Sequence, residues 1–392
     1  MSHLSKVFIA SASRTPVGSF KGSLSKLSAI QLGVHAAKSA IRKAGIKPED
    51  VNEVYMGQVI QAGMGQAPAR QVALGAGCGE NTPSTTVNKV CASGMKAVIF
   101  ATQNIQTGTQ HIMLAGGMES MSNSPLRFYT PRSASYGHQN MLDSIIKDGL
   151  TDAYDHIHMG SCAEETAAKY EITREQQDNH AINSYKRAAE AWKAGILTPE
   201  VVPIKFMSGK KEVTVDTDEE FTNIKVDKIS SLRPVFKKKE GTVTAANASK
   251  LSDGASALIL ASEQKVGEMN LKPIAEIISY ADAACAPKLF TIAPSLAVPI
   301  ALTRAGLEIK DISLFEFNEA FSVVSLVNEK LLGLDPSQCN IAGGAVGLGH
   351  PIGSSGARII VTLAHLLKPG QYGCAAICNG GGGASAVIIK KL

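Results

Sequence analysis

The sequence lacks a long apolar run, a basic stripe and a set of aromatic residues spread among basic ones. No stretch of its 392 residues is apolar without interruption over the roughly 18 positions that a bilayer-crossing helix needs, so we expect no membrane partner. Aromatic residues make up only 5 %, with a single tryptophan. Surfaces that bind nucleic acid combine clustered basic residues with exposed aromatic rings. We therefore expect no nucleic-acid partner.

The excess of positive charge is small. The formal net charge is +5 at pH 7, and the longest block of basic residues is Lys237-Lys238-Lys239. Such a run is most often a solvated loop. The alternative interpretation is a docking patch for a ligand that carries phosphate groups, and the sequence leaves both open.

The cysteines do not form a disulfide or zinc pattern. Their number is odd and the sequence contains no Cys-x-x-Cys pair, in a chain too long to need disulfide staples. We therefore expect free thiols in a reducing compartment. The seven cysteines are Cys78, Cys91, Cys162, Cys285, Cys339, Cys374 and Cys378.

The first residues, MSHLSKVFIASASRTP, enter a strand-like segment almost at once. They show neither the apolar core of a secretory signal nor an Arg/Ser-rich presequence. We expect either a mature chain whose presequence has been removed or a protein that never carried one.

Three segments near the amino end return near the carboxyl end in the same order. AIRKAGIKPEDVNEV (residues 40–54) matches ALTRAGLEIKDISLF (301–315), VCASGMKA (90–97) matches PIGSSGAR (351–358), and IMLAGGMES resembles AAICNGGGGAS. Each first-pair segment reads as a helix end, a glycine stop and a strand. The nearly constant spacing predicts a duplicated unit of alternating strands and helices, hence a layered α/β fold.

The middle of the chain differs from both repeats. It is polar and rich in loops, and it carries one strongly helical stretch near residues 162–195. We predict an amino-terminal half (residues 1–120), an inserted loop domain (121–249) and a carboxyl-terminal half (250–392). Long inserted loops often form a ligand site.

Two residues lie where the repeated segments predict a turn before a helix. Cys91 precedes the helix expected from Ala92 onward, where free N–H groups favour a thiolate; the alternative is a small buried core cysteine. His350 lies among glycines just before the equivalent helix and is a candidate general base. The alternative for His350 is a loop histidine hydrogen-bonded to backbone.

Two more candidates follow predicted buried strands. Cys378 ends the strand CAAIC and precedes four glycines from Gly380 to Gly383, whose N–H groups can form an oxyanion hole. Asn318 follows the strand LFEF. It can hold a water or an oxyanion, or it can serve as a helix N-cap. For Cys378 a plain core role is equally open.

Seven collinear motifs make the whole chain resemble the thiolase family. They are VNKVCASGMKA, AGGMESMSN, HMGSCAE, NASKLSDGA, FNEAF, GGAVGLGHPIGSSGAR and CNGGGGASA. Within that family, the His-Met-Gly at residues 158–160 resembles the acetoacetyl-CoA thiolases, above all the mitochondrial animal type. The resemblance implies an α/β thiolase fold: a duplicated five-layered α-β-α-β-α core with an inserted loop domain, assembled as a homo-oligomer, with a tetramer expected.

The resemblance also implies a reaction and a set of roles. The reaction is the reversible condensation of two acetyl-CoA to acetoacetyl-CoA and CoA, with possible activity on the 2-methyl derivative left open. Cys91 would carry the acetyl group, His350 would activate it, and Cys378 would move the proton at the α-carbon. Asn318 would hold a water in one oxyanion hole, while the N–H groups of Cys91 and Gly380 would form the other.

Further residues are implied for the cofactor-like substrate and for an ion. No tightly bound cofactor is expected, and coenzyme A enters as substrate and product. The residues expected near coenzyme A are His158, Met159, Tyr185, Asn223, Lys228 and Ser249. At Asn223 the chain departs from the family pattern, which has an arginine beside the adenine, so Lys225 and Lys228 are expected to take over phosphate contacts. The residues implied for a potassium ion are Tyr185, Ala245, Ala246, Ala248 and Val346.

Other members of the superfamily remain as alternatives. A degradative 3-ketoacyl-CoA thiolase of broad chain-length range would share the catalytic residues, but generally lacks the histidine at 158. A carrier-protein-dependent ketoacyl synthase typically has histidine in place of Cys378. A non-catalytic lipid-transfer or scaffolding relative would not need all four reactive positions. For location, the resemblance implies the mitochondrial matrix, with the cytoplasm as the alternative.

Overall fold

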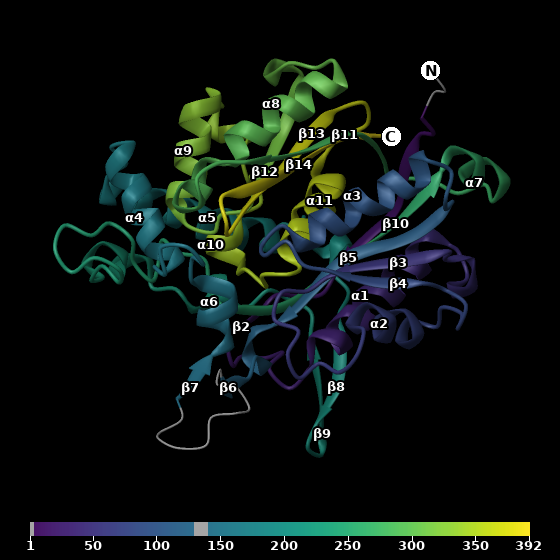
Figure 1. Cartoon of the computed structure of the whole chain (residues 1–392), viewed down its shortest axis with the longest axis horizontal. Helices are drawn as coiled ribbons and strands as arrows, with labels where there is room; N and C mark the ends of the chain where they lie inside the picture. Colours follow the sequence, from purple (N-terminus) through teal and green to yellow (C-terminus); the bar gives the residue numbers. More distant parts are fainter. Residues whose placement is uncertain (1–3, 129–139) are drawn as a thin grey trace.

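The computed structural model describes residues 4–128 and 140–392 of the chain (Figure 1). Ten strands form one mixed sheet in the order β12-β13-β14-β11-β1-β10-β5-β3-β4, with β2 paired to β10. These strands are β1 (Val7–Arg14), β2 (Gly18–Ser19), β3 (Glu53–Gly57), β4 (Ser84–Val87), β5 (Ile112–Ser120), β10 (Ser252–Ser262), β11 (Ala275–Ala284), β12 (Ile312–Phe317), β13 (Tyr372–Asn379) and β14 (Gly383–Lys391).

The sheet consists of two halves with the same pairing pattern. In the first, β4, β3 and β5 are parallel, and β10 and β1 follow as antiparallel neighbours. In the second, β12 and β13 are parallel, and β14 and β11 follow in the same antiparallel sense. The halves meet where residues 7–9 of β1 pair with residues 275–277 of β11. The duplication predicted from the sequence is thus present as repeated topology.

The helices complete five layers. Helix α1 (Ala29–Ala44) covers the outer face of the first half, with α2 (Pro68–Ala76) beside it. Helices α3 (Ser93–Gln106) and α11 (Ser355–Leu366) contact each other and strands of both halves, so they form the central layer. Helix α8 (Pro294–Ala305) covers the outer face of the second half. This arrangement confirms the predicted α/β fold with five layers.

Equivalent helices end in the same way. Helix α1 ends at Gly45 and α8 ends at Gly306, with φ of +71° and +66°. A left-handed residue at this position closes a helix by a backbone hydrogen bond, and glycine adopts it without strain. The next strand of each half, β3 or β12, follows after a short 3-10 turn, η1 (Pro48–Asp50) or η7 (Ile309–Asp311).

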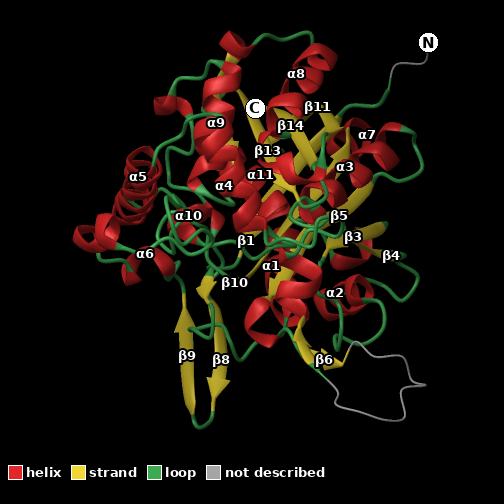
Figure 2. Cartoon of the chain, turned by 60° about the vertical axis from the view of Figure 1, so that its left-hand side comes forward, coloured by secondary structure: helices red, strands yellow, loops and turns green. Residues whose placement is uncertain are grey.

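The segment between the halves forms its own small elements. Its strands β6 (Leu126–Phe128) and β7 (Met141–Asp143) pair with each other, as do β8 (Ile204–Ser208) and β9 (Lys211–Val215). The β8–β9 hairpin projects from the layered body (Figure 2). The helices of this segment are α4 (Met159–Lys169), α5 (Arg174–Lys193), α6 (Glu220–Asn223), the π-helical η3 (Ile145–Leu150) and the 3-10 turns η2 (Met121–Asn123), η4 (Thr198–Glu200) and η5 (Val226–Ser231).

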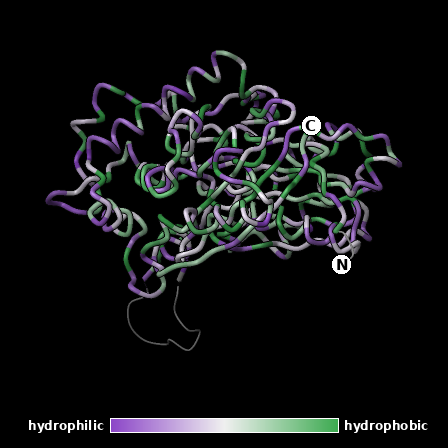
Figure 3. The backbone as a smooth tube through the Cα atoms, turned by 90° about the horizontal axis from the view of Figure 1, so that it is seen from above, coloured by the Kyte–Doolittle hydropathy of each residue, from purple (hydrophilic) through white to green (hydrophobic). Residues whose placement is uncertain are grey.

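The remaining elements lie in the second half of the chain. They are α7 (Glu263–Glu268), α9 (Ser322–Leu332), α10 (Ala345–Leu348), η6 (Pro287–Ile292) and η8 (Pro336–Gln338). Hydrophobic stretches run through the interior of the body, and hydrophilic stretches dominate its periphery (Figure 3). Within the described ranges, no helix combines the length and apolarity needed to span a membrane.

Candidate active site

The two central helices begin side by side. A Cβ added to Gly94 would lie 2.9 Å from the Ala357 nitrogen, and one added to Gly356 would lie 2.7 Å from the Met95 nitrogen. Only glycine permits so close a backbone approach. Because Cys91 lies just before α3 and His350 just before α11, the crossing brings both predicted reactive residues to one cavity.

Cys91 follows a strained residue. Val90 has φ +47°, a conformation that is rare for a β-branched residue and whose cost is typical of functional turns. The Ser93 hydroxyl holds the turn: it accepts from the Lys89 N–H at 2.8 Å and donates to the Val90 carbonyl at 2.6 Å.

The Cys91 thiol is protonated at rest. Burial raises its pKa to about 12, while the backbone N–H groups of Gly380 and of Cys91 itself have a smaller, opposite effect. We expected the helix start to favour a thiolate; the helix start does supply an N–H group, but desolvation outweighs it. A base is therefore needed to remove the proton during attack.

His350 is buried and lines the same cavity as Cys91. Its Nδ1 lies 2.6 Å from the Ser355 hydroxyl, and its Nε2 lies 3.5 Å from the Asn318 amide nitrogen. Its backbone N–H donates to the Lys250 carbonyl and to the Ser252 hydroxyl, each at 3.1 Å. Burial, with a smaller effect from Arg358, lowers the pKa of His350 to about 3. The imidazole is therefore neutral and able to accept a proton.

Asn318 lies behind His350 at the end of β12. Its N–H donates to the Ala376 carbonyl at 3.0 Å, while its Oδ1 is buried and has no hydrogen-bond partner among the described residues. The residue at the N-cap of α9 is Phe321, so the N-cap interpretation of Asn318 is wrong. A buried amide oxygen without a partner is costly and suits a position that receives a water or substrate.

Glu319, the residue after Asn318, holds the loop between β12 and α9 in place. Its buried carboxylate accepts from Ser184 at 2.7 Å, from the Val346 N–H at 3.0 Å and from Asn340 at 3.0 Å, and it pairs with His180 at 3.1 Å. Burial raises the carboxyl pKa, but the His180 contact and the other donors leave it lowered overall. Glu319 is therefore a structural anchor.

Cys378 is the second-to-last residue of β13 and is fully buried. It packs in one hydrophobic cluster with Met159, Phe290 and Phe321, which line the cavity. Burial, reinforced by nearby Cys91, raises its pKa well above the usual value. Cys378 is therefore a thiol at rest whose thiolate would be strongly basic.

One cavity of about 400 Å³ brings Cys91, His350 and Gly380 together with residues of the inserted segment. Asn318 and Cys378 are not among the residues that line it. The other lining residues include Ser249, Lys250, His158, Met159, Phe236, Phe290 and Leu150. His158 is the N-cap of α4, its Nδ1 accepting from the Gly160 N–H at 3.0 Å, and its ring stacks on Phe236 with centroids 4.7 Å apart.

The remaining predicted coenzyme A contacts lie away from this lining. Asn223, in α6, donates to the Ser19 hydroxyl at 3.1 Å and is exposed. Lys228 is exposed in η5, and Lys225 lies just before it. Tyr185 is buried on α5. Their roles toward coenzyme A stay predictions.

Three of the residues implied for potassium lie together, while Ala245 is exposed. Tyr185 packs with Ala246 and Val346, and its hydroxyl donates to the Ala246 carbonyl at 3.2 Å. Lys250 also belongs here: its ammonium donates to the Tyr185 hydroxyl at 2.8 Å and to the Ala248 carbonyl at 2.9 Å. Burial lowers the pKa of Lys250 to about 8, so at pH 7 the set already holds a cationic group, which fits poorly with a bound ion.

The sequence analysis did not single out several residues of the site. Ser355 is the first residue of α11 and lies five positions after His350, so their contact depends on the turn between them and not on helical spacing. Lys250 lies inside NASKLSDGA. Its position directly after Ser249, a residue expected near coenzyme A, was the sequence feature that could have identified it. The contact of Phe236 with the site and the positive φ of Val90 could not be predicted from the neighbouring sequence, because both depend on long-range packing.

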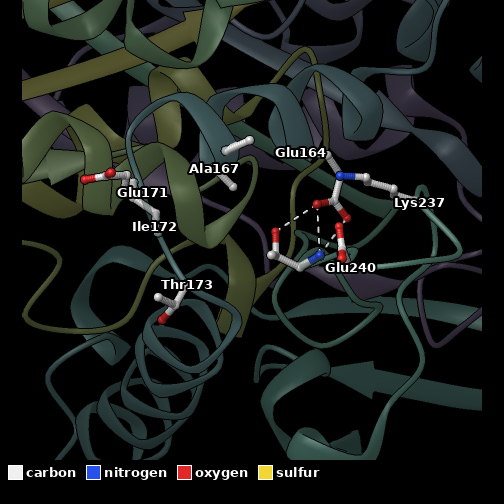
Figure 4. A pocket seen from close by; sticks show the side chains of 9 residues that line it. Glu164, Ala167, Glu171, Ile172, Thr173, Lys237 and Glu240 are labelled. Atoms are coloured by element: carbon white, nitrogen blue, oxygen red, sulfur yellow. Dashed lines mark hydrogen bonds between the residues drawn. The ribbon is translucent and has the colours of Figure 1, made fainter.

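A second cavity, of about 240 Å³, lies beside α4 (Figure 4). The Glu164 carboxylate on its wall accepts from the Thr242 N–H at 2.8 and 2.9 Å, from the Thr242 hydroxyl at 2.8 Å and from the Val243 N–H at 2.8 Å. These bonds use the carboxylate to hold the loop at residues 242–243. Lys237 lies on the same wall, and Lys237–Lys239 are exposed, as expected for a solvated run.

The family models place the chain in a known class. The model "Thiolase, N-terminal domain" matches residues 7–264, and "Thiolase, C-terminal domain" matches residues 271–391. The chain therefore belongs to the thiolase family, which confirms the resemblance found in the sequence.

The relatives narrow the class further. Acetyl-CoA acetyltransferase A, mitochondrial, of Xenopus laevis is 54 % identical over 391 residues, covering 99 % of this chain and 93 % of that protein. The mitochondrial acetyl-CoA acetyltransferase of Bos taurus is 56 % identical, covering 99 % and 92 %. The crystal structure of Acat5 thiolase from Ascaris suum in complex with coenzyme A matches with a TM-score of 0.95 and 48 % identity, covering 99 % of this chain and all of that one.

Proposed function

We propose that this protein is an acetyl-CoA C-acetyltransferase that interconverts two acetyl-CoA with acetoacetyl-CoA and CoA through an S-acetyl-Cys91 intermediate. The observation that carries the proposal is the convergence of Cys91, His350 and Gly380 on one cavity. The names of the mitochondrial acetyl-CoA acetyltransferases, more than half identical to this chain, support the substrate.

In the cleavage direction, Cys91 attacks the C3 carbonyl of acetoacetyl-CoA. The thiol proton passes to His350, whose neutral imidazole can accept it. The C2–C3 bond breaks, C2 takes the proton of the Cys378 thiol, and acetyl-CoA leaves. The products of this half are an acetyl thioester on Cys91, a protonated His350 and a Cys378 thiolate.

The second half restores the enzyme. CoA gives its thiol proton to the Cys378 thiolate and attacks the acetyl group on Cys91. Cys91 leaves as thiolate and recovers its proton from His350. Splitting the transfer into two steps lowers each barrier, and condensation runs the same steps in reverse.

Two oxyanion sites follow from the donors present. Cys91 and Gly380 line the same cavity, and their backbone N–H groups would hold the oxygen of an acyl group bound there. His350 and a water on Asn318 would hold the enolate oxygen of acetyl-CoA. Removing one such donor typically costs about 3–4 kcal/mol of transition-state stabilisation.

The inserted segment at residues 121–249 would hold coenzyme A. His158, Met159 and Ser249 line the cavity and would contact the pantetheine, and the exposed Lys228 of η5 would contact a phosphate. We further propose a homo-oligomer, with a tetramer expected, in the mitochondrial matrix. Potassium is left out of this proposal because the Lys250 ammonium already binds two oxygens that an ion would need.

The test compares cleavage of acetoacetyl-CoA with cleavage of 3-ketohexadecanoyl-CoA, for the wild type and Cys91→Ala. We expect preference for the short substrate and loss of roughly 10³-fold or more of the rate in the variant, since the nucleophile is removed. Mass spectrometry of the wild type with acetyl-CoA should show one acetyl group on Cys91.

Cys78→Ala is the matched control, because Cys78 packs in the outer cluster of the first half. It should keep the wild-type rate. A faster rate with the long substrate would reassign the enzyme to broad-range 3-ketoacyl-CoA cleavage, and full activity of Cys91→Ala would refute the catalytic assignment.

A further inference from the structure

Lys250 lies where the family resemblance implies an ion. Its ammonium donates to the Tyr185 hydroxyl at 2.8 Å and to the Ala248 carbonyl at 2.9 Å. Both oxygens belong to residues of the implied potassium set. The same Tyr185 hydroxyl reaches a third member, since it donates to the Ala246 carbonyl at 3.2 Å.

An ammonium group and a potassium ion carry the same charge, and both are satisfied by neutral oxygens. An ammonium brings three N–H donors of its own and is tethered to the chain, so it loses no translational freedom on binding. A second monovalent cation about 4 Å away would be repelled strongly enough to weaken its binding roughly a thousandfold at an effective dielectric constant of 20.

The position also connects to the reactive centre. The Lys250 carbonyl accepts the His350 N–H at 3.1 Å and the Ser252 hydroxyl at 3.0 Å. The next residue, Leu251, forms a bridge with His350. The side chain of Lys250 therefore fastens the loop of Ala248 and Ser249 to α5, while its backbone holds His350.

We propose that the Lys250 ammonium is a built-in cation that takes the place of potassium, so that the enzyme orders its coenzyme A loop without a monovalent metal ion. The part of this inference that concerns the KM for CoA rests on the proposed function. The part that concerns thermal unfolding does not, because unfolding can be measured without catalysis.

The first experiment compares the wild type in KCl, NaCl and choline chloride at equal ionic strength. Both the midpoint of thermal unfolding and the KM for CoA should be the same in the three salts. A specific rise in the midpoint or fall in KM with KCl would show that potassium binds beside Lys250, and would overturn the proposal.

The second experiment removes the ammonium. Lys250→Ala should unfold at lower temperature in choline chloride, and KCl should restore about 2–4 °C more than NaCl does. The KM for CoA should rise at least about fivefold in choline chloride and recover in KCl. A variant that KCl does not rescue would overturn the replacement of an ion by the ammonium.

Two matched variants sharpen the outcome. In Lys250→Ala combined with Tyr185→Phe, the potassium rescue should vanish because one of the oxygens is gone. Lys265→Ala removes an exposed lysine of α7 and should show no salt-specific response. Rescue that persists without the Tyr185 oxygen would contradict the site. If acetoacetyl-CoA is not cleaved, the thermal measurements still decide the question.

Discussion

The imidazole of His350 links folding to acidity. Its pKa is lowered by burial to about 3 in the folded protein and is near 6.5 in an unfolded chain. Between those values the unfolded chain binds a proton that the folded protein refuses, so stability rises with pH there and is lost as the pH falls below 6.5.

A pair of unfolding curves measures this effect. Relative to His350→Asn, the wild type should lose about 2 kcal/mol of unfolding free energy between pH 7 and pH 5. Urea titrations at one protomer concentration isolate the contribution of His350 to the free energy of unfolding, since every other histidine is common to both proteins. An equal pH dependence in the two proteins would mean that folding does not change the pKa of His350.

Single residues differ in how far the sequence predicts their roles. Cys91, His350 and Gly380 could be identified because glycines and a helix start surround them, and those signals are local. Lys250 could not, because its function depends on α5 and the 244–250 loop meeting in space. The protonation state of Cys91 was also beyond local sequence, since burial by distant elements outweighs the helix start.

At the scale of elements, the repeated helix ends offer a symmetric test. An added Cβ at Gly45 or Gly306 meets nothing within 4 Å, yet both residues have positive φ. Replacing either by alanine should therefore cost backbone strain alone, about 1–2 kcal/mol each. Thermal or urea unfolding of the two variants measures the cost.

Gly267→Ala is the control for this pair. Gly267 lies inside α7, also with open space around it, but its φ is not positive. Alanine there should stabilise by about 0.5–1 kcal/mol. Unequal effects at Gly45 and Gly306 would mean that the two caps are not equivalent, despite their matching sequences.

The elements were predictable where a local pattern repeats. The helix ends, glycine stops and buried strands of the two halves follow directly from the matched segments. The joining of the halves through β1 and β11 was not predicted, because nothing in VFIAS specifies which strand will become its second neighbour. The domain boundaries at 120 and 249 remain predictions.

At the scale of the whole molecule, a buried ion cluster ties the inserted segment to the core. Arg14, at the end of β1, binds Asp218 through two nitrogens at 2.6 and 2.9 Å and Glu200 through Nε at 2.5 Å. Arg14 and Asp218 are essentially inaccessible. The two carboxylates need this guanidinium, since no other Lys or Arg side chain among the described residues bonds to them.

Removing the Arg14 guanidinium should destabilise the folded protein more than a substitution at the surface does. Arg14→Ala leaves two buried carboxylates without their cationic partner, and it should cost about 3–5 kcal/mol of unfolding free energy. Lys265→Ala, which breaks the exposed pair with Glu268, should leave the free energy of unfolding almost unchanged. A similar loss of unfolding free energy in both variants would show that the buried cluster contributes no more to stability than an exposed ion pair.

The position of β1 in the sheet has a consequence for how the protein is made. This strand leaves the ribosome early, yet both of its neighbours, β10 and β11, come from the later part of the chain. Until they arrive, the nascent chain exposes an apolar strand with two unpaired edges, a feature that invites aggregation. The strand is therefore synthesised long before its two partners. We expect chaperones that bind nascent chains to protect the first half of this protein above all.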